Sequence, residues 1–276
     1  MNDAPLKLRV AARVCPACDR PADGPPLLPQ APPEWAMTRC RGCGFVYLAN
    51  GPVYEELVTN LAWERTREVR SADRLEQRPV SHRLSLATRA RLRVLPRKNV
   101  CALIKQYAVP GNVLDLGCGG GTQFHILDRD YVPFGIDVSK SEAEQADAFF
   151  GSRGGSAVNA PCLQGIAAFP ESFFTAATLR SYLEHESRPR DVLAALHSRM
   201  RPGGKLIIKV PNYGSLNRRV MGRHWCGYRF PDHLNYFTAA SLRAMVTGTG
   251  YRMHRFGLID HLPTSDNMWM VAARPG

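Results

Sequence analysis

A run of glycines at residues 117–121 follows a short apolar segment, and residues of this type and spacing commonly surround a phosphate or a nucleotide. Glycine lets the backbone approach a ligand without a Cβ clash. A Walker-type phosphate loop would end in Gly-Lys-Ser/Thr, but Gly121 is followed by Thr122 and Gln123. A dinucleotide fingerprint would place Gly or Ala five residues after the first glycine, where this chain has Thr122. The first alternative is excluded, and the second is weakened but stays open.

The remaining pattern is an acid followed by alternate glycines, Asp115-x-Gly117-x-Gly119-x-Gly121. A carboxylate just before the turn suits a cation better than a pyrophosphate. S-adenosylmethionine carries such a cation, because its methionyl ammonium can be held by Asp115 directly or through water. Cys118, inside the loop, is interpreted as a small residue that fills space. The loop therefore predicts S-adenosylmethionine binding, with these five residues in contact with the cofactor.

A second acid, Asp137, ends an apolar segment twenty residues after the first loop glycine. A carboxylate at the end of a strand can accept both ribose hydroxyls of a nucleoside. Val138 beside it can lie against the adenine ring. The structural alternative for Asp137 is a helix N-cap, because Ser139 and Glu142 follow in a capping arrangement. The two motifs together favour the cofactor interpretation.

Four of the eight cysteines form two Cys-x2-Cys pairs near the start of the chain: Cys15 with Cys18, and Cys40 with Cys43. Each pair places two thiolates on one side of a tight turn, and Gly44 permits a left-handed backbone after the second pair. The proline-rich stretch between the pairs has little to pack against by itself. The spacing predicts a closed, structural zinc site in a ribbon-like module over residues 1–50. Disulfides and a rubredoxin-like iron site are the alternatives.

Composition limits the architecture to one ordinary domain and a small module. The chain has 276 residues, of which 45% are hydrophobic and 22% charged, so a packed core is expected. No apolar run reaches the roughly 18 residues of a membrane span. The first twenty residues have interspersed basic side chains instead of an apolar signal core. These features predict a cytoplasmic protein without a membrane span.

The chain has a formal net charge of +12, and much of this positive charge lies in the segment between the cysteine pairs and the glycine loop. Residues 60–105 contain 12 Lys/Arg against 4 Asp/Glu, and acids and bases there alternate at helical spacing. We interpret residues 51–108 as a basic helical linker with a solvated face. An anionic partner, such as nucleic acid, a phosphorylated metabolite or an acidic lipid, is the alternative.

Strand-like and helix-like segments alternate after Pro110 and Gly111, which predicts a parallel sheet with helices on both faces. We expect an α/β, Rossmann-like, doubly wound sheet of about seven strands over residues 109–276. The expected strands are 112–116, 132–137, 156–159, 173–180 and 205–210, with closing strands towards the C-terminus. The expected helices are 122–129, 140–150, 189–200 and a segment beginning at 241.

These motifs, together with "RPGGKLIIKVPN" at residues 201–212, resemble the class I S-adenosylmethionine-dependent methyltransferases over residues 112–276. The segments "YLEHE", "KVPNYGSLNRR" and "FPDHLNYFTAASL" look like the ubiquinone-pathway type of small-molecule methyltransferase. They also look like bacterial sugar methyltransferases that begin with a four-cysteine zinc module. The sugar enzymes have a further C-terminal domain that does not follow here. Phe174-Thr175 also departs from the Phe-Asp that often begins the fourth strand of the group.

Ligands of such folds lie over the C-terminal ends of the strands, so the segments after the fourth and fifth strands should line the reaction centre. His185 and His233 are candidate bases for an acceptor hydroxyl or activated carbon. For His185 the resemblance leaves a second interpretation, because the same Glu-His pair, here with Glu184, is associated with a divalent ion in ubiquinone-type enzymes. For His233 the alternative is a role in folding a lid. The remaining predicted residues are Tyr182 and Tyr236 as catalytic candidates, and Leu179 and Arg180 as cofactor-binding candidates.

Three functions compete. The first is methylation of a small molecule on O, N or C; the side chains of Arg218, Arg219, Arg223 and Arg229 suit an anionic acceptor, or else are simply solvated. The second is RNA methylation, in which the zinc module and the basic linker hold the RNA, although the Asn/Asp-Pro-Pro-Tyr/Phe motif common in base N-methylation is not found. The third is a non-catalytic binding protein, against which the intact glycine loop and Asp137 argue. We favour the first, with a small-molecule substrate as partner and no prediction of oligomeric state.

Overall fold

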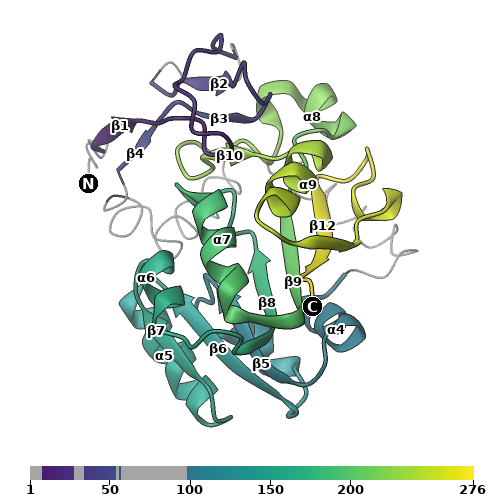
Figure 1. The fold of residues 1–276 in the computed structure, drawn as a ribbon. Helices are drawn as coiled ribbons and strands as arrows, with labels where there is room; N and C mark the ends of the chain where they lie inside the picture. Colours follow the sequence, from purple (N-terminus) through teal and green to yellow (C-terminus); the bar gives the residue numbers. More distant parts are fainter. Residues whose placement is uncertain (1–7, 28–33, 54–55, 57–97) are drawn as a thin grey trace, which may run out of the picture.

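The computed structural model describes residues 8–27, 34–53, 56 and 98–276 of the chain. A seven-stranded sheet forms the centre of the larger part, and a small module containing the four cysteines lies above it in Figure 1. Of the predicted linker, residues 54–55 and 57–97 lie outside the described residues. Within the described ranges, no helix is long and apolar enough to cross a membrane.

The central sheet has the order β11-β12-β9-β8-β5-β6-β7. Its first five strands along the chain are parallel, and the last two pair antiparallel at one edge. This arrangement confirms the predicted Rossmann-like α/β fold. The strands are β5 (Gly111–Leu116), β6 (Tyr131–Asp137), β7 (Ser156–Asn159), β8 (Phe174–Arg180), β9 (Met200–Pro211), β11 (Arg252–Arg255) and β12 (Asn267–Ala273).

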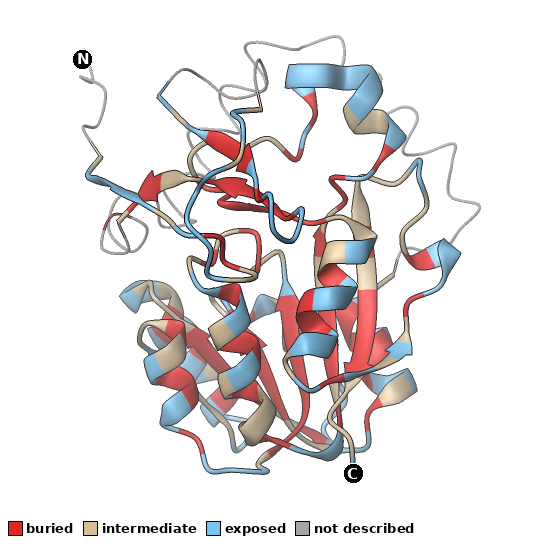
Figure 2. Cartoon of the chain, turned by 45° about the horizontal axis from the view of Figure 1, so that its top comes forward, coloured by how far each residue is buried: buried red, intermediate tan, exposed pale blue. Residues whose placement is uncertain are grey.

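Helices cover both faces of the sheet, so its strands are apolar on both sides (Figure 2). Alternate residues of β5 point to opposite faces: Val113 packs with α4, η1 and α5, whereas Leu114 packs with α6, α7 and α9. Asp115, two residues after Val113, therefore lies on the α4 and α5 face. The helices are α4 (Val100–Tyr107), α5 (Lys140–Gly151), α6 (Cys162–Ala167), α7 (Pro189–Arg199) and α9 (Ala239–Gly248), and η1 (Thr122–Ile126) is a 3-10 turn.

The turn η1 and the short helix α6 are two of the elements that differ from the sequence-based expectation. The helix expected over 122–129 is the 3-10 turn η1, which follows the left-handed Gly121 (φ 75°) and ends at the extended Leu127. Phe124 is the buried residue of this turn, so one apolar anchor holds it rather than an amphipathic stripe. Helix α6 was not expected, because it has only six residues and contains Gly165.

The cysteine module contains two small sheets (Figure 1). One pairs β1 (Val10–Ala12) with β4 (Asn50–Pro52), and the other pairs β2 (Met37–Arg39) with β3 (Val46–Leu48). Strand β10 (Asn235–Tyr236), from the larger part of the chain, adds to the second sheet by pairing antiparallel with β3. The module is therefore joined to the larger part by backbone hydrogen bonds as well as by side chains.

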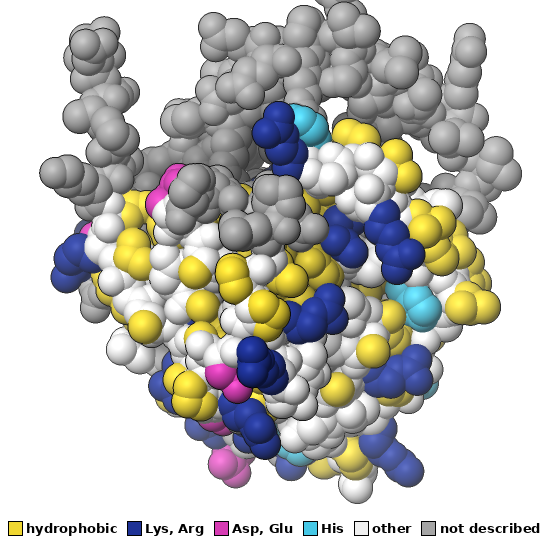
Figure 3. Space-filling view, turned by 90° about the horizontal axis from the view of Figure 1, so that it is seen from above, with side chains coloured by type: hydrophobic (Ala, Val, Ile, Leu, Met, Phe, Trp, Pro, Cys, Tyr) yellow, Lys and Arg dark blue, Asp and Glu magenta, His cyan; other side chains and the backbone are white. Residues whose placement is uncertain are grey.

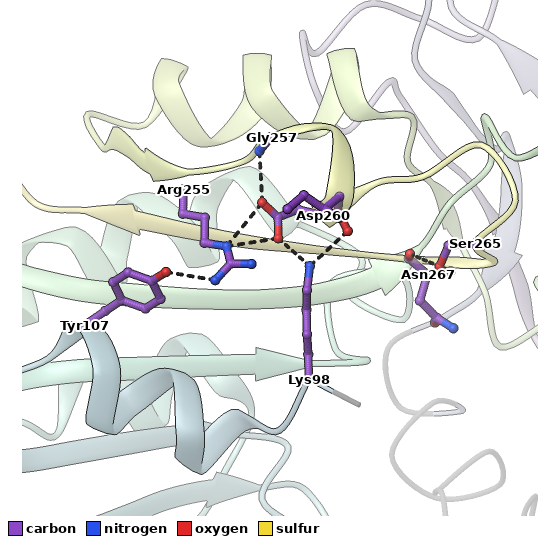
Figure 4. A network of polar contacts seen from close by, with 8 residues as sticks. Lys98, Tyr107, Arg255, Gly257, Asp260, Ser265 and Asn267 are labelled. Atoms are coloured by element: carbon purple, nitrogen blue, oxygen red, sulfur yellow. Dashed lines mark hydrogen bonds and ion pairs between the residues drawn. The ribbon is translucent and has the colours of Figure 1, made fainter. Parts of the chain in front are cut away.

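A polar cluster ties the start of α4 to the segment after β11 (Figure 4). The buried carboxylate of Asp260 accepts hydrogen bonds from Lys98, from Arg255 and from the backbone N–H of Gly257, which immediately precedes the 3-10 turn η3 (Leu258–Asp260). Arg255 also donates to the hydroxyl of Tyr107 at 2.8 Å. These bonds hold α4, the described end of the linker, against the antiparallel edge of the sheet.

Candidate functional site

The glycine loop has the backbone geometry that its sequence requires. Gly117, Gly119 and Gly121 have φ values of 70°, 51° and 75°, a region that side-chain-bearing residues rarely adopt. A Cβ on Gly121 would also lie 2.8 Å from Cε1 of Phe150, so this glycine permits close packing of α5 on the loop. The buried Cys118 packs in the same apolar cluster as Phe150.

Asp115 is buried near the carboxyl end of β5, just before the glycine loop. Its carboxylate accepts hydrogen bonds from Thr178 Oγ1 at 2.5 Å and from Gln123 Nε2 at 3.1 Å. Burial raises the pKa of Asp115 to about 7, against the opposing effects of the Thr178 hydrogen bond and the positive charge of Arg180. A bound ammonium ion is the kind of partner that restores the ionised form.

Asp137 joins the loops that follow β5 and β6. Its carboxylate accepts hydrogen bonds from the backbone N–H of Gly119 at 2.8 Å and of Ser139 at 2.9 Å. The N-cap of α5 is Ser139, whose hydroxyl accepts from the N–H of Glu142. Asp137 is therefore not the capping residue of this helix, and the half-exposed carboxylate lies next to the glycine loop. Val138, beside it, is also half-buried.

The two predicted cofactor contacts at the end of β8 lie in different surroundings. Leu179 is fully buried in the core beneath α6 and α7. Arg180 is exposed, and its guanidinium donates to Gln123 Oε1 at 2.9 Å. Gln123 thus links Arg180 to Asp115. Sequence reasoning missed Gln123, since a glutamine after a glycine loop carries no signal of its own.

The turn after β8, residues 181–187, lies directly against the glycine loop. A Cβ built on Gly117 would be 3.0 Å from Cδ2 of Tyr182, so the tyrosine ring covers this glycine. The hydroxyl of Tyr182 donates to Glu186 Oε2 at 2.5 Å. Ser181 has φ 55°, and such strain in a residue other than glycine is frequent at functional sites.

Glu184, His185 and His233 come together from two distant segments. One ligand atom of each lies within 4.8 Å of the others, and the two imidazole centroids are 4.7 Å apart. His185 Nδ1 is 3.0 Å from the carbonyl oxygen of Asp232, and His233 Nδ1 is 2.8 Å from that of Gly227. A carbonyl oxygen only accepts, so Nδ1 of each ring carries a proton, and the neutral form of each ring has its lone pair on Nε2.

Two ionisable groups lie close to these histidines: Glu184, which the sequence analysis named, and Lys209, which it did not. Burial raises the pKa of Glu184 to about 7, partly opposed by its backbone hydrogen bond and by Lys209 and Arg229. Its Oε2 atom is buried without a hydrogen-bond partner among the described residues. Lys209, at the end of β9, donates to Ser181 Oγ at 3.1 Å, and burial lowers its pKa.

Tyr236 lies in an aromatic cluster between the module and the loop before β10. Its ring centroid is 5.7 Å from Tyr213, 5.8 Å from Tyr228 and 6.3 Å from Phe230. Burial raises the pKa of its hydroxyl far above the usual value, so this tyrosine stays protonated near neutral pH. These surroundings are those of a packed wall.

The four arginines that were predicted to suit an anion are placed differently. Arg219 and Arg223 are exposed, on α8 (Leu216–Met221) and on the 3-10 turn η2 (Gly222–His224). Arg218 is half-buried, 4.1 Å above the ring of Tyr213, and Arg229 is half-buried. Seen from above, many Lys and Arg side chains and few acids lie on the described part of this face (Figure 3).

The four predicted zinc ligands lie together, with their sulfur atoms within 4.8 Å of one another. Cys15 Sγ is 3.5 Å from Cys43 Sγ, and Cys18 Sγ is 3.5 Å from Cys40 Sγ. A tetrahedral zinc site with Zn–S bonds of about 2.3 Å has sulfur separations of roughly 3.8 Å, so this donor set fits zinc. Gly44 has the expected left-handed backbone (φ 74°).

The fold is that of the class I methyltransferase architecture, and comparison with known proteins agrees. A family described as "Methyltransferase domain" matches residues 82–255, more than half of the sequence. The chain belongs to this methyltransferase domain family. A search of curated proteins finds no match.

Three solved structures illustrate the shared fold, each with a TM-score of 0.50. The [4+2]-cyclase SpnF is 17% identical, over 64% of this chain and 80% of that one. YcgJ from Bacillus subtilis is 16% identical, over 63% and 97%. A putative methyltransferase from Bacillus halodurans is 16% identical, over 64% and 99%. The structural similarity establishes a common fold, and at these low identities the acceptor stays open.

Proposed function

We propose that this protein transfers a methyl group from S-adenosylmethionine to a small molecule, on an oxygen, nitrogen or carbon atom. The observation that carries the proposal is the packing of Tyr182 on Gly117, which places the turn with Glu184 and His185 directly against the glycine loop. A methyl donor in the loop and an acceptor beside the turn would therefore be neighbours. Family membership supports the donor.

The residues of the loop would hold the cofactor, which supplies an electrophilic methyl group. Asp115 offers a carboxylate to the ammonium group, and Asp137 offers one to the ribose hydroxyls. The glycines allow close approach of the backbone. Alignment of donor and acceptor is the main help that a protein can give to an in-line displacement. The rigid ends of β5, β6 and β8 provide that alignment.

His233 is the proposed base. Its Nδ1–H donates to the carbonyl of Gly227, which orients the ring and makes Nε2 the basic nitrogen, the atom proposed to take a proton from an acceptor hydroxyl or activated carbon. His185 has the same arrangement with the carbonyl of Asp232. Because Glu184 and both rings converge, the alternative of a divalent ion at this position now involves His233 as well.

We further propose one structural zinc ion, held by Cys15, Cys18, Cys40 and Cys43. All four thiols would be used, so the ion would have no open position for chemistry. Elemental analysis of protein purified without added metal tests this assignment. Iron, or no metal with four free thiols, would contradict it.

The burial of Glu184 and His233 supports a small acceptor, because an enclosed group is less accessible to a nucleic acid than to a metabolite. RNA methylation is the second candidate, and the exposed arginines of α8 and η2 favour it. A strip that binds single-stranded RNA would combine such cations with exposed aromatic rings. The aromatic side chains of this region are instead packed together.

Incubation with isotopically labelled S-adenosylmethionine and either total RNA or a metabolite extract distinguishes the candidates. Methyl transfer must be detected directly, since one protein with this fold is described as a cyclase. We expect label in the small-molecule fraction. His233→Ala should lower turnover by about a hundredfold or more while S-adenosylhomocysteine still binds. Label in RNA would establish the second function, and loss of cofactor binding in the variant would make His233 a structural residue.

A further inference from the structure

The cysteine module and the reaction centre share backbone hydrogen bonds. Strand β10 begins two residues after His233 and pairs with β3, with Asn235 opposite Tyr47. The N–H of Leu48 donates to the carbonyl of Leu234 at 2.9 Å. The segment that carries His233 is thus held by the strand that follows the second cysteine pair.

The turn that carries Glu184 and His185 is attached to the same strand. The carbonyl of Glu184 accepts hydrogen bonds from the N–H groups of Leu234 and Asn235, at 2.7 and 3.1 Å. The side-chain amide of Asn235 donates to the carbonyls of Leu183 at 2.8 Å and Glu186 at 2.6 Å. Asn235 therefore fixes the position of the turn relative to β10.

Arg13, two residues before the first cysteine, joins all three segments. Its guanidinium donates to the carbonyl of Leu48 at 3.0 Å in the module and to that of Leu234 at 3.2 Å before β10. It also donates to the carbonyl of Ser187 at 3.1 Å and to Asn235 Oδ1 at 3.2 Å. The planar, five-donor geometry of arginine makes four such bonds from one side chain, which lysine cannot reproduce.

We propose that Arg13 is a positioning residue of the reaction centre: by binding the module, the turn at 183–187 and strand β10 together, it sets the distance between the Glu184–His185 pair and His233. The expected effect of Arg13 on turnover rests on the proposed function. Its expected effect on the positions of the two histidines does not. The cofactor loop makes none of these four bonds. Arg13 should therefore govern the acceptor side and leave cofactor binding unchanged.

The test compares Arg13→Lys with the matched control Arg190→Ala. Arg190 also bridges the module and the larger part, through a 2.8 Å ion pair with Asp19, but both side chains are largely exposed. Exposed pairs of this kind contribute little. Calorimetry with S-adenosylhomocysteine, zinc analysis, and nuclear magnetic resonance titration of the histidine rings provide readouts that need no acceptor.

In Arg13→Lys we expect S-adenosylhomocysteine affinity to stay within about threefold of the native protein and the zinc content to be unchanged. The reason is that the guanidinium of Arg13 donates no hydrogen bond to the glycine loop or to the cysteine thiols. We expect the resonances and pKa values of His185 and His233 to move. Turnover, once an acceptor is found, should fall by about tenfold or more, mostly in kcat. Arg190→Ala should match the native protein in every measurement.

Unmoved histidine resonances in a folded Arg13→Lys protein would overturn the inference, as would an equal loss of cofactor affinity. Should Arg13→Lys fail to fold, Asn235→Ala removes the two bonds from Asn235 to the turn and one of the four Arg13 bonds, and the same histidine shifts are expected. Displaced histidines in a protein that transfers no methyl group would support the positioning role and refute the proposed function. Methyl transfer with undisplaced histidines would do the reverse.

Discussion

The two sides of the candidate site are assembled in opposite ways. The cofactor side consists of residues at or just after the carboxyl ends of neighbouring strands, and one of its main contacts joins Gly119, in the loop after β5, to Asp137, at the end of β6. The acceptor side combines residue 13, the turn at 181–187 and the loop up to β10, which are far apart in sequence. The first needs only the parallel sheet to form, whereas the second needs a separate module to dock.

This difference predicts independent failure of the two sides. Parallel strands bring their carboxyl ends together by topology alone, so β5, β6 and β8 deliver Asp115, Asp137 and Arg180 to one edge. The acceptor side has no such scaffold, since its histidines lie in a turn and a loop. The following predictions test whether either side can change without the other.

Loss of a zinc ligand should have the largest effect and should break the acceptor side alone. Structural zinc contributes an apparent free energy of about 10–16 kcal/mol in small zinc peptides, so Cys18→Ser should release the ion and disorder the module. The histidine resonances should then shift while S-adenosylhomocysteine affinity changes by less than about threefold. Cys226→Ser, at an exposed cysteine outside the cluster, is the control for zinc content. Equal damage to cofactor binding would contradict the separation.

Asp137→Ala should break the cofactor side alone. The variant loses the proposed bonds to the ribose as well as the bond from Gly119 N–H, and hydrogen bonds to charged groups contribute about 1.5–3 kcal/mol each. Calorimetry should show S-adenosylhomocysteine affinity reduced by about tenfold to a hundredfold, with unchanged histidine resonances. The exposed Asp130, at the opposite end of the strands, provides the control variant Asp130→Ala. An unchanged affinity for S-adenosylhomocysteine would show that Asp137 has a structural role and does not bind the cofactor.

The pH dependence of cofactor binding sharpens the comparison. Burial raises the pKa of Asp115 to about 7 in the free protein, and a bound ammonium group favours the carboxylate and lowers that pKa. Below pH 7, affinity for S-adenosylhomocysteine should therefore rise by about tenfold per pH unit, with proton release, and should level off above pH 7. Calorimetry in buffers of different ionisation enthalpy measures both quantities. The variant Asp115→Asn should bind S-adenosylhomocysteine weakly and independently of pH. If its affinity still changed with pH, the pH dependence would belong to another group.

Asp260→Ala should change stability while leaving both sides intact, because its cluster with Lys98 and Arg255 lies at the antiparallel edge (Figure 4). We expect urea unfolding at pH 7 to show a loss of about 1–3 kcal/mol. Although burial raises the pKa of Asp260, its bonds to Lys98 and Gly257 outweigh burial and lower it. The stabilisation is therefore present above the unfolded pKa and disappears as the pH falls through the lower folded value. A reduced cofactor affinity would place the cluster within the cofactor side.

The strands and the helix that frame the proposed cofactor side were predictable because their sequence signals are local. Strand β7 begins and ends where the pattern of apolar residues predicted, and the capping sequence after Asp137 identified the start of α5, although Ser139 is the cap. The turn η1 was missed because a single buried phenylalanine leaves no periodic pattern.

The acceptor side could be predicted only as a set of residue types. Histidines at 185 and 233 were recognisable as candidates, but their convergence depends on β10 pairing with β3, and a two-residue strand has no sequence signal. Arg13 and Lys209 likewise gain their surroundings only from tertiary contacts.

The pairing of β3 with β10 also has a consequence for the order of events during synthesis. The ribosome releases the cysteine module about 190 residues before Asn235 and Tyr236 emerge, so β3 must wait for its partner strand. Forming a contact across so many residues is slow. Until β10 pairs with β3, the exposed edge of β3 can pair with strands of other chains and aggregate. Early zinc capture would keep the module compact during that interval. The main effect of the proposed zinc ion would then be to stabilise the nascent chain, before the reaction centre has formed.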